Sequence, residues 1–100
     1  MIRGTTPTHT FTLPFDVSAI KEIKITYAQG GKQIFCKRRE DCVLDGMTVQ
    51  TTLTQEETFM LDCKRLVEVQ IRVRTVEGEV VATDPIPVTV GKCLDDEVLT

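Results

Sequence analysis

The sequence predicts an all-β fold, an immunoglobulin-like antiparallel β-sandwich of about seven strands with one short helical turn. Three observations predict it: polar and apolar residues alternate in short segments, glycine-containing turns join these segments, and only one stretch carries a helix-start signal. The strands are expected at residues 8–13, 21–28, 32–38, 41–44, 47–53, 66–76 and 79–90. A small β-barrel is the alternative architecture.

The first predicted strand alternates threonines with Phe11 and Leu13 and stops at Pro14. A hairpin follows, with Gly30-Gly31 as its two-residue loop, and this turn places Tyr27 opposite Ile34. The core face of this hairpin is then expected to hold Ile23, Ile25, Tyr27, Ile34 and Cys36. The opposite face carries Glu22, Lys24, Thr26, Phe35, Lys37 and Arg39, so that Phe35 is an isolated aromatic on a polar surface.

Asp45-Gly46 predicts the second hairpin, with Leu44 opposite Met47 and Cys42 opposite Val49 on an apolar face. After it, Thr54-Gln55-Glu56-Glu57 has the spacing of a capping box. The Thr54 side chain can cap the N-terminus of a helix, and the Glu57 side chain can accept a hydrogen bond from the Thr54 backbone N–H. We expect one or two helical turns there.

Glu77-Gly78 predicts the third hairpin, which begins with the clearest alternation in the chain. Its inward residues are Val67, Val69, Ile71 and Val73, and its partner supplies Ala82, Ile86, Val88 and Val90. This register places Asp84 opposite Ile71. Because Pro85 follows, we expect a bulge or a strand break at that point.

Length and composition indicate one domain. The chain has 100 residues, of which 1–92 are expected to form the sandwich and 93–100 a polar C-terminal tail. No apolar run approaches the ~20 residues that a membrane helix requires, and the N-terminus does not resemble a secretory signal. A net charge of −3 argues against general affinity for nucleic acid.

The four cysteines, Cys36, Cys42, Cys63 and Cys93, are expected to be free thiols. Their irregular spacing is poor for structural zinc, and Cys36 and Cys42 fall on predicted core faces. Cys63 lies beside Lys64-Arg65, but the sole histidine, His9, has no cysteine-enzyme signature around it. The sequence therefore predicts no catalytic residue, no metal site and no cofactor.

Two features predict an interface. Phe35 would be an aromatic anchor on a polar sheet face. The run Lys37-Arg38-Arg39 would form a basic patch with Arg72 and Arg74 if their strands were neighbours. The simpler interpretation of these cations is a set of solvated strand edges.

Three motifs carry a resemblance: the stretch from Arg3 to Phe11 (RGTTPTHTF), Leu13-Pro14-Phe15-Asp16, and Leu53 to Thr58 (LTQEET). On these, the chain resembles small immunoglobulin-like proteins of phages and prophages of Gram-positive bacteria and is similar to the N-terminal domain of phage baseplate upper proteins. The chain differs from the baseplate protein in that no receptor-binding module is expected after the sandwich, and this difference favours an accessory or adaptor role.

The resemblance implies a non-catalytic structural or assembly protein of the tail or baseplate. Its partners would be other phage structural proteins or a second copy, with no nucleic acid or membrane involved. Its location would be the host cytoplasm during assembly, with the virion as a further place. The alternative function is a small cysteine-dependent or metal-binding regulatory protein.

Overall fold

The computed structural model describes residues 1–100, which form strands and short helical segments joined by turns and loops. The strands are β1 (Thr8–Thr12), β2 (Ile20–Gln29), β3 (Lys32–Arg38), β4 (Cys42–Asp45), β5 (Thr48–Thr52), β6 (Val67–Thr75), β7 (Val80–Ala82) and β8 (Ile86–Val88). The helix is α1 (Gln55–Phe59), and the 3-10 turns are η1 (Val17–Ala19) and η2 (Arg39–Asp41). The predicted all-β class is confirmed.

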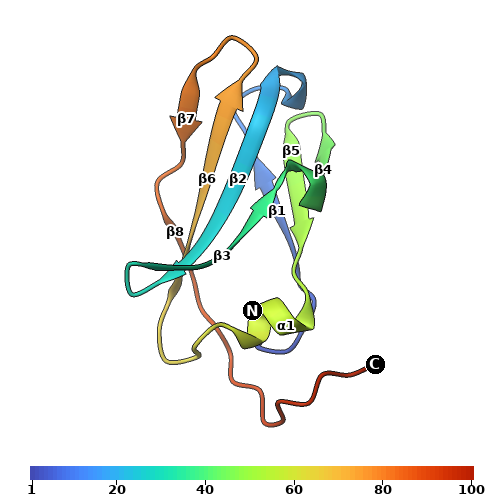
Figure 1. The fold of residues 1–100 in the computed structure, drawn as a ribbon, viewed down its shortest axis with the longest axis vertical. Coiled ribbons are helices and arrows are strands. Elements are labelled where there is room, and N and C mark those ends of the chain that lie inside the picture. The colour runs from blue at the N-terminus through green and yellow to red at the C-terminus, as the bar shows by residue number, and fades with distance from the viewer.

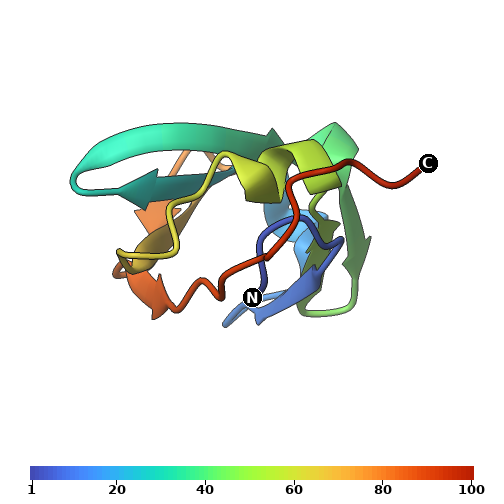
Figure 2. The same ribbon diagram turned by 90° about the horizontal axis from the view of Figure 1, so that it is seen from below.

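Two antiparallel sheets face each other (Figures 1 and 2). The smaller has the order β1-β5-β4, and the larger has the order β3-β2-β6-β7, with β8 also paired to β6. Hairpins stay within one sheet, whereas the β1–β2, β3–β4 and β5–β6 connections cross between sheets. This is the order B-E-D and C′-C-F-G of an immunoglobulin-like sandwich. Ile2 adds a parallel bridge to Gly91.

The first hairpin contains a bulge that changes which side chains face inward. Gly30 and Gly31 form the expected turn, with φ of 58° and 77°. The register then shifts, because Ile34 is an extra residue in β3 and Phe35 lies opposite Tyr27. An extra residue turns every later side chain to the other face of the sheet. The prediction that Phe35 faces outward is therefore wrong.

Two further face assignments change with the same bulge. Cys36 lies opposite Thr26 on the outer face, so its predicted core position is also wrong. Lys37 lies opposite Ile25 and is buried.

The second hairpin turns at Gly46-Met47, one residue later than expected. The predicted pairs are therefore wrong: Leu44 lies opposite Val49, Cys42 lies opposite Thr51, and Met47 falls in the turn and is exposed. Because the register moves by two residues, the strand side chains keep the facing that was predicted. Cys42 and Leu44 therefore pack against the core as predicted.

The last predicted strand is two strands in line along the same edge of β6 (Figure 1). The expected break at Asp84-Pro85 is confirmed, since β7 ends before it and β8 begins after it. The turn that precedes β7 is one residue longer than expected. Val81 therefore lies inward opposite Val73, and the inward position predicted for Ala82 is wrong.

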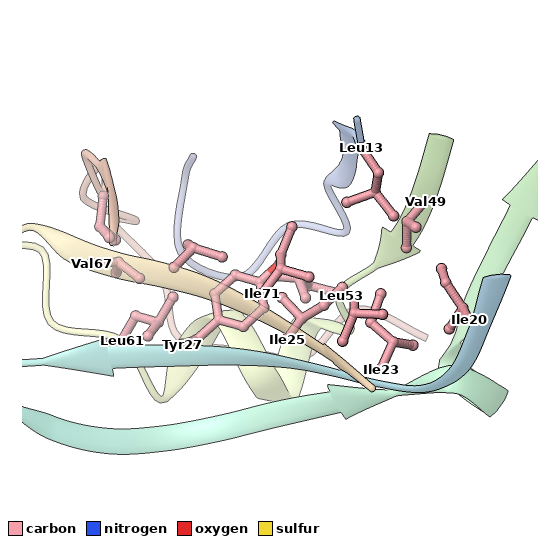
Figure 3. Packing of buried hydrophobic residues seen from close by; sticks show 13 residues of the cluster. Leu13, Ile20, Ile23, Ile25, Tyr27, Val49, Leu53, Leu61, Val67 and Ile71 are labelled. Atoms are coloured by element: carbon pink, nitrogen blue, oxygen red, sulfur yellow. The ribbon is translucent and has the colours of Figure 1, made fainter. Parts of the chain in front are cut away.

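The core lies between the two sheets (Figure 3). Most of it comes from β2 and β6, and Tyr27 and Ile25 are fully buried. Its members are Leu13, Ile20, Ile23, Ile25, Tyr27, Val49, Leu53, Leu61, Val67, Val69, Ile71, Val73 and Val90. α1 lies at one end of the sandwich, with the C-terminal segment running past it (Figure 2). The longest helical segment, α1, has five residues, and none of the helical segments could span a lipid bilayer.

Candidate binding surface

A row of cations crosses the outer face of the larger sheet. In this row Lys24 on β2 lies directly opposite Arg38 on β3 and, on its other side, directly opposite Arg72 on β6. Like charges directly opposite each other on neighbouring strands destabilise a sheet. The arrangement therefore places positive charge here at some expense of stability.

Arg74 extends this surface along β6, because it is the next residue after Arg72 on the same face and lies opposite Glu22. We call Lys24, Arg38, Arg72 and Arg74 the basic face. Together with Glu22 they line a shallow open hollow of about 180 Å³. The alternation of β6 explains the direction of both arginines, because Val73 between them points into the core.

No member of the basic face forms an ion pair. The two ion pairs of the protein are Arg3–Asp96 and Lys37–Glu57, and neither lies on this surface. The basic face is thus free to bind an anionic group, in a chain whose net charge is −3.

The predicted run Lys37-Arg38-Arg39 is divided by the fold. The strands that carry these residues are not neighbours, because β2 lies between β3 and β6. Only Arg38 lines the same hollow as Arg72 and Arg74. Arg39 instead donates from Nη1 to the backbone oxygen of Ile20 at 2.6 Å. Lys24 was not predicted for this surface.

Lys37 and Glu57 form a buried ion pair that joins β3 to α1. Lys37 Nζ lies 2.6 Å from Glu57 Oε1, and the two side chains are 8% and 19% exposed. The same carboxylate oxygen accepts a hydrogen bond from the Thr54 backbone N–H at 2.9 Å. This contact links β3 to α1, and it removes Lys37 from any surface site.

An aromatic stack connects the two sheets. The Tyr27 ring lies 4.7 Å from that of Phe35 and 5.7 Å from that of His9. Tyr27 Oη is 2.7 Å from His9 Nδ1. Burial raises the pKa of Tyr27, and burial together with the N-terminal charge lowers the pKa of His9. Phe35 is half-buried within this stack and is not exposed on the polar outer face, which was the reason for predicting an interface role. That role stays a prediction.

All four cysteines are free, and no group of three or more His, Cys, Asp or Glu side chains is placed so that it could hold a metal ion. Cys42 packs against the core, and burial raises the pKa of its thiol above the ordinary value. A higher pKa leaves less of the reactive thiolate. Cys42 and His9 both lie opposite Thr51 in one cross-strand row, but no hydrogen bond joins a cysteine to His9, whose ring nitrogen contacts Tyr27. The cysteine-dependent or metal-binding function stays a prediction.

A second hollow, of about 240 Å³, opens between the sheets beyond the end of β1. It is apolar, with Leu13, Pro14 and Phe15 on one side and Ile71, Val73, Val81, Ala82 and Thr83 on the other. Sequence reasoning missed it, because its two sides come from segments far apart in the chain.

The fold and the basic face define a class of protein, an immunoglobulin-like sandwich with one positively charged sheet face. Comparisons with family models, with curated proteins and with solved structures found no match to this chain. The surface chemistry is therefore what supports a function.

Proposed function

We propose that this protein is a non-catalytic structural or assembly protein of a phage or prophage, acting as an accessory of the tail or baseplate by protein–protein binding. Within that role, the basic face binds an acidic surface of another structural protein. The phage context rests on the resemblance of the three motifs described above. The binding mode rests on the charges of the larger sheet.

The single observation that carries the binding mode is the cross-strand row Arg38, Lys24 and Arg72. None of its three cations forms an ion pair within the chain, and Glu22 is the one acidic residue that lines the same hollow. A carboxylate-bearing partner would relieve their repulsion, so that part of the binding free energy would come from removing a strain of the free protein. Arg favours such contacts because its planar guanidinium can hold a carboxylate with two hydrogen bonds.

The test is a titration of this protein against each purified structural protein encoded beside its gene, followed by calorimetry at low and high salt. We expect one of them to bind, with an affinity that falls as salt rises because surface charges are screened. The double variant Arg72→Glu/Arg74→Glu should abolish this binding.

The matched control is Lys64→Glu/Lys92→Glu, which makes the same change of net charge away from the basic face and should bind normally. Equal binding by both double variants, or no binding to any neighbouring product, would contradict the proposal. A mobility shift of DNA or RNA by the unmodified protein, lost at high salt, would point instead to nucleic acid.

A further inference from the structure

The two sheets present four free edges, of which three are protected against pairing with another chain. β3 carries the exposed cations Lys32 and Arg38. β4 has only four residues, and the last is Asp45. β7 and β8 are separated by a break, and β8 contains Pro87. Charges, short strands and proline are the usual means by which proteins prevent edge-to-edge pairing.

β1 is short, with five residues, but it lacks the other protections. Its sequence Thr-His-Thr-Phe-Thr contains no proline, no Lys, Arg, Asp or Glu, and no bulge, and it pairs only with β5. An uncharged, regular strand edge is a template for a further strand.

The backbone of β1 is oriented for such pairing. The Leu13 N–H donates to the Met47 carbonyl at 2.8 Å, and the Leu53 N–H donates to the Pro7 carbonyl at 2.9 Å. In an antiparallel ladder, hydrogen-bonded positions alternate. Pro7, His9, Phe11 and Leu13 are therefore the positions that bond to β5, and the alternate residues direct their N–H and C=O groups away from it. These residues are Thr8, Thr10 and Thr12, and their backbone groups have no partner across the free edge.

We propose that two copies of this chain associate through β1, paired antiparallel about a two-fold axis at Thr10. The strand is self-complementary in this register. Thr10 lies opposite Thr10 of the second copy, and Thr8 lies opposite Thr12, so that all the outward backbone groups find partners. A partner of different sequence is not required, because there is no charge on this edge to neutralise.

Side chains favour the same register. The exposed threonines of one copy lie opposite those of the other, and Thr–Thr pairs stabilise antiparallel strands. On the inner face, half-buried His9 lies opposite Phe11, which makes an aromatic cross-strand pair. Pro7 of the second copy lies opposite Leu13, at the apolar hollow beyond the end of β1.

The measurement is the mass of the protein in solution, by light scattering and sedimentation over a range of concentrations with reductant present to exclude disulfides. We expect a dimer with twice the 11.2 kDa of one chain. Thr10→Lys and Thr10→Glu should each be folded monomers, because they place like charges opposite each other at the axis. Their mixture should form a heterodimer, since the charges are then opposite.

Val43→Lys is the matched control. Val43 is 64% exposed on β4, the other edge of the same sheet, and lies in one cross-strand row with Gln50 and Thr10. This variant should remain dimeric. A monomeric unmodified protein at every concentration, a dimeric Thr10→Lys variant, or dissociation by Val43→Lys would overturn the proposal.

Amide hydrogen exchange gives a second readout that requires no variant. The amides of Thr8, Thr10 and Thr12 should exchange slowly in concentrated protein and rapidly after dilution, whereas those of His9 and Phe11 should stay protected by β5. Rapid exchange of the threonine amides at every concentration would overturn the proposal. The dimer does not depend on the proposed function, because the basic face lies on the other sheet.

Discussion

Lys37 is a cation that the fold holds away from water. Its ammonium group has one acidic partner, Glu57, at 2.6 Å, and both side chains are largely buried. Removing one member of such a pair leaves a poorly solvated charge, whereas replacing both members by neutral groups avoids this penalty. The pair therefore makes β3 and α1 depend on each other.

Lys37→Met should lower the free energy of unfolding by on the order of 2–3 kcal/mol, less than for a fully buried pair because Glu57 retains some solvent contact. Urea unfolding measures the change. The double variant Lys37→Met/Glu57→Gln should recover most of the loss, and Lys32→Met, an exposed cation of the same strand, should change stability little. Unchanged stability of Lys37→Met would contradict this role for the ion pair.

His9 makes the stability of the protein sensitive to pH. Its pKa in the folded state is lowered, first by burial and second by the N-terminal charge, from the ordinary value of 6.5. Below pH 6.5 the unfolded chain therefore binds more protons at this residue than the folded chain. The stability due to neutral His9 is present above that pH and is lost as pH falls toward the folded-state pKa.

The urea midpoint should thus fall between about pH 7 and pH 5.5, and it should fall less for His9→Gln, which does not titrate. Both proteins are compared at one concentration, because dimer formation makes stability concentration-dependent. An identical pH dependence of the two proteins would exclude His9 as the cause.

At the scale of elements, α1 is too short to be stable in isolation and depends on its ends and its packing. Thr54 Oγ1 accepts from the Glu57 N–H at 3.1 Å, and Glu57 Oε1 accepts from the Thr54 N–H at 2.9 Å. The predicted capping box is confirmed. Gln55, the first residue of α1, pairs with both backbone groups of Leu99 and so holds the C-terminal segment against the helix.

Thr54→Ala should lower the free energy of unfolding by about 1 kcal/mol, because the Glu57 N–H loses its acceptor. Chemical denaturation checks this value. Thr6→Ala, at an exposed position whose side chain makes no hydrogen bond, is the control and should be neutral. Equal effects of the two variants would mean that the cap contributes nothing specific.

At the scale of the whole molecule, positive charge is concentrated on one surface of a chain that is negatively charged overall. The chain is acidic overall, yet the outer face of the larger sheet gathers four cations, and the row through Lys24 places three of them side by side. Sequences retain such arrangements when binding requires them, at some expense of stability. The unprotected edge of β1 lies on the smaller sheet, so the two surfaces can act independently.

Lys24→Glu should raise the free energy of unfolding by about 0.5 kcal/mol, because the new carboxylate lies between Arg38 and Arg72. The same substitution should weaken binding to an acidic partner. Lys21→Glu, which changes net charge equally at an exposed position outside the row, should do neither. A loss of stability in Lys24→Glu would contradict the like-charge repulsion inferred for this surface.

Local chemistry in the sequence determined most of the elements. Glycines predicted the turns, and the alternation of polar and apolar residues predicted the core faces of β2 and β6. Thr54 and Glu57 predicted the start of the helix, and Asp84-Pro85 predicted the strand break. Arg72 and Arg74 could be placed on the outer face because they alternate with buried valines. Lys24 could have been added to them only by knowing that β2 lies between β3 and β6.

Only the tertiary structure decided which way β3 faces beyond its turn. Two registers of the Gly30-Gly31 hairpin are compatible with its sequence, one that is regular and one with Ile34 as an extra residue. The bulged register stacks Phe35 on Tyr27 and brings Lys37 to Glu57, more than a dozen residues away on α1. These contacts form only when the sandwich is assembled, which is why alternation within the hairpin could not reveal them.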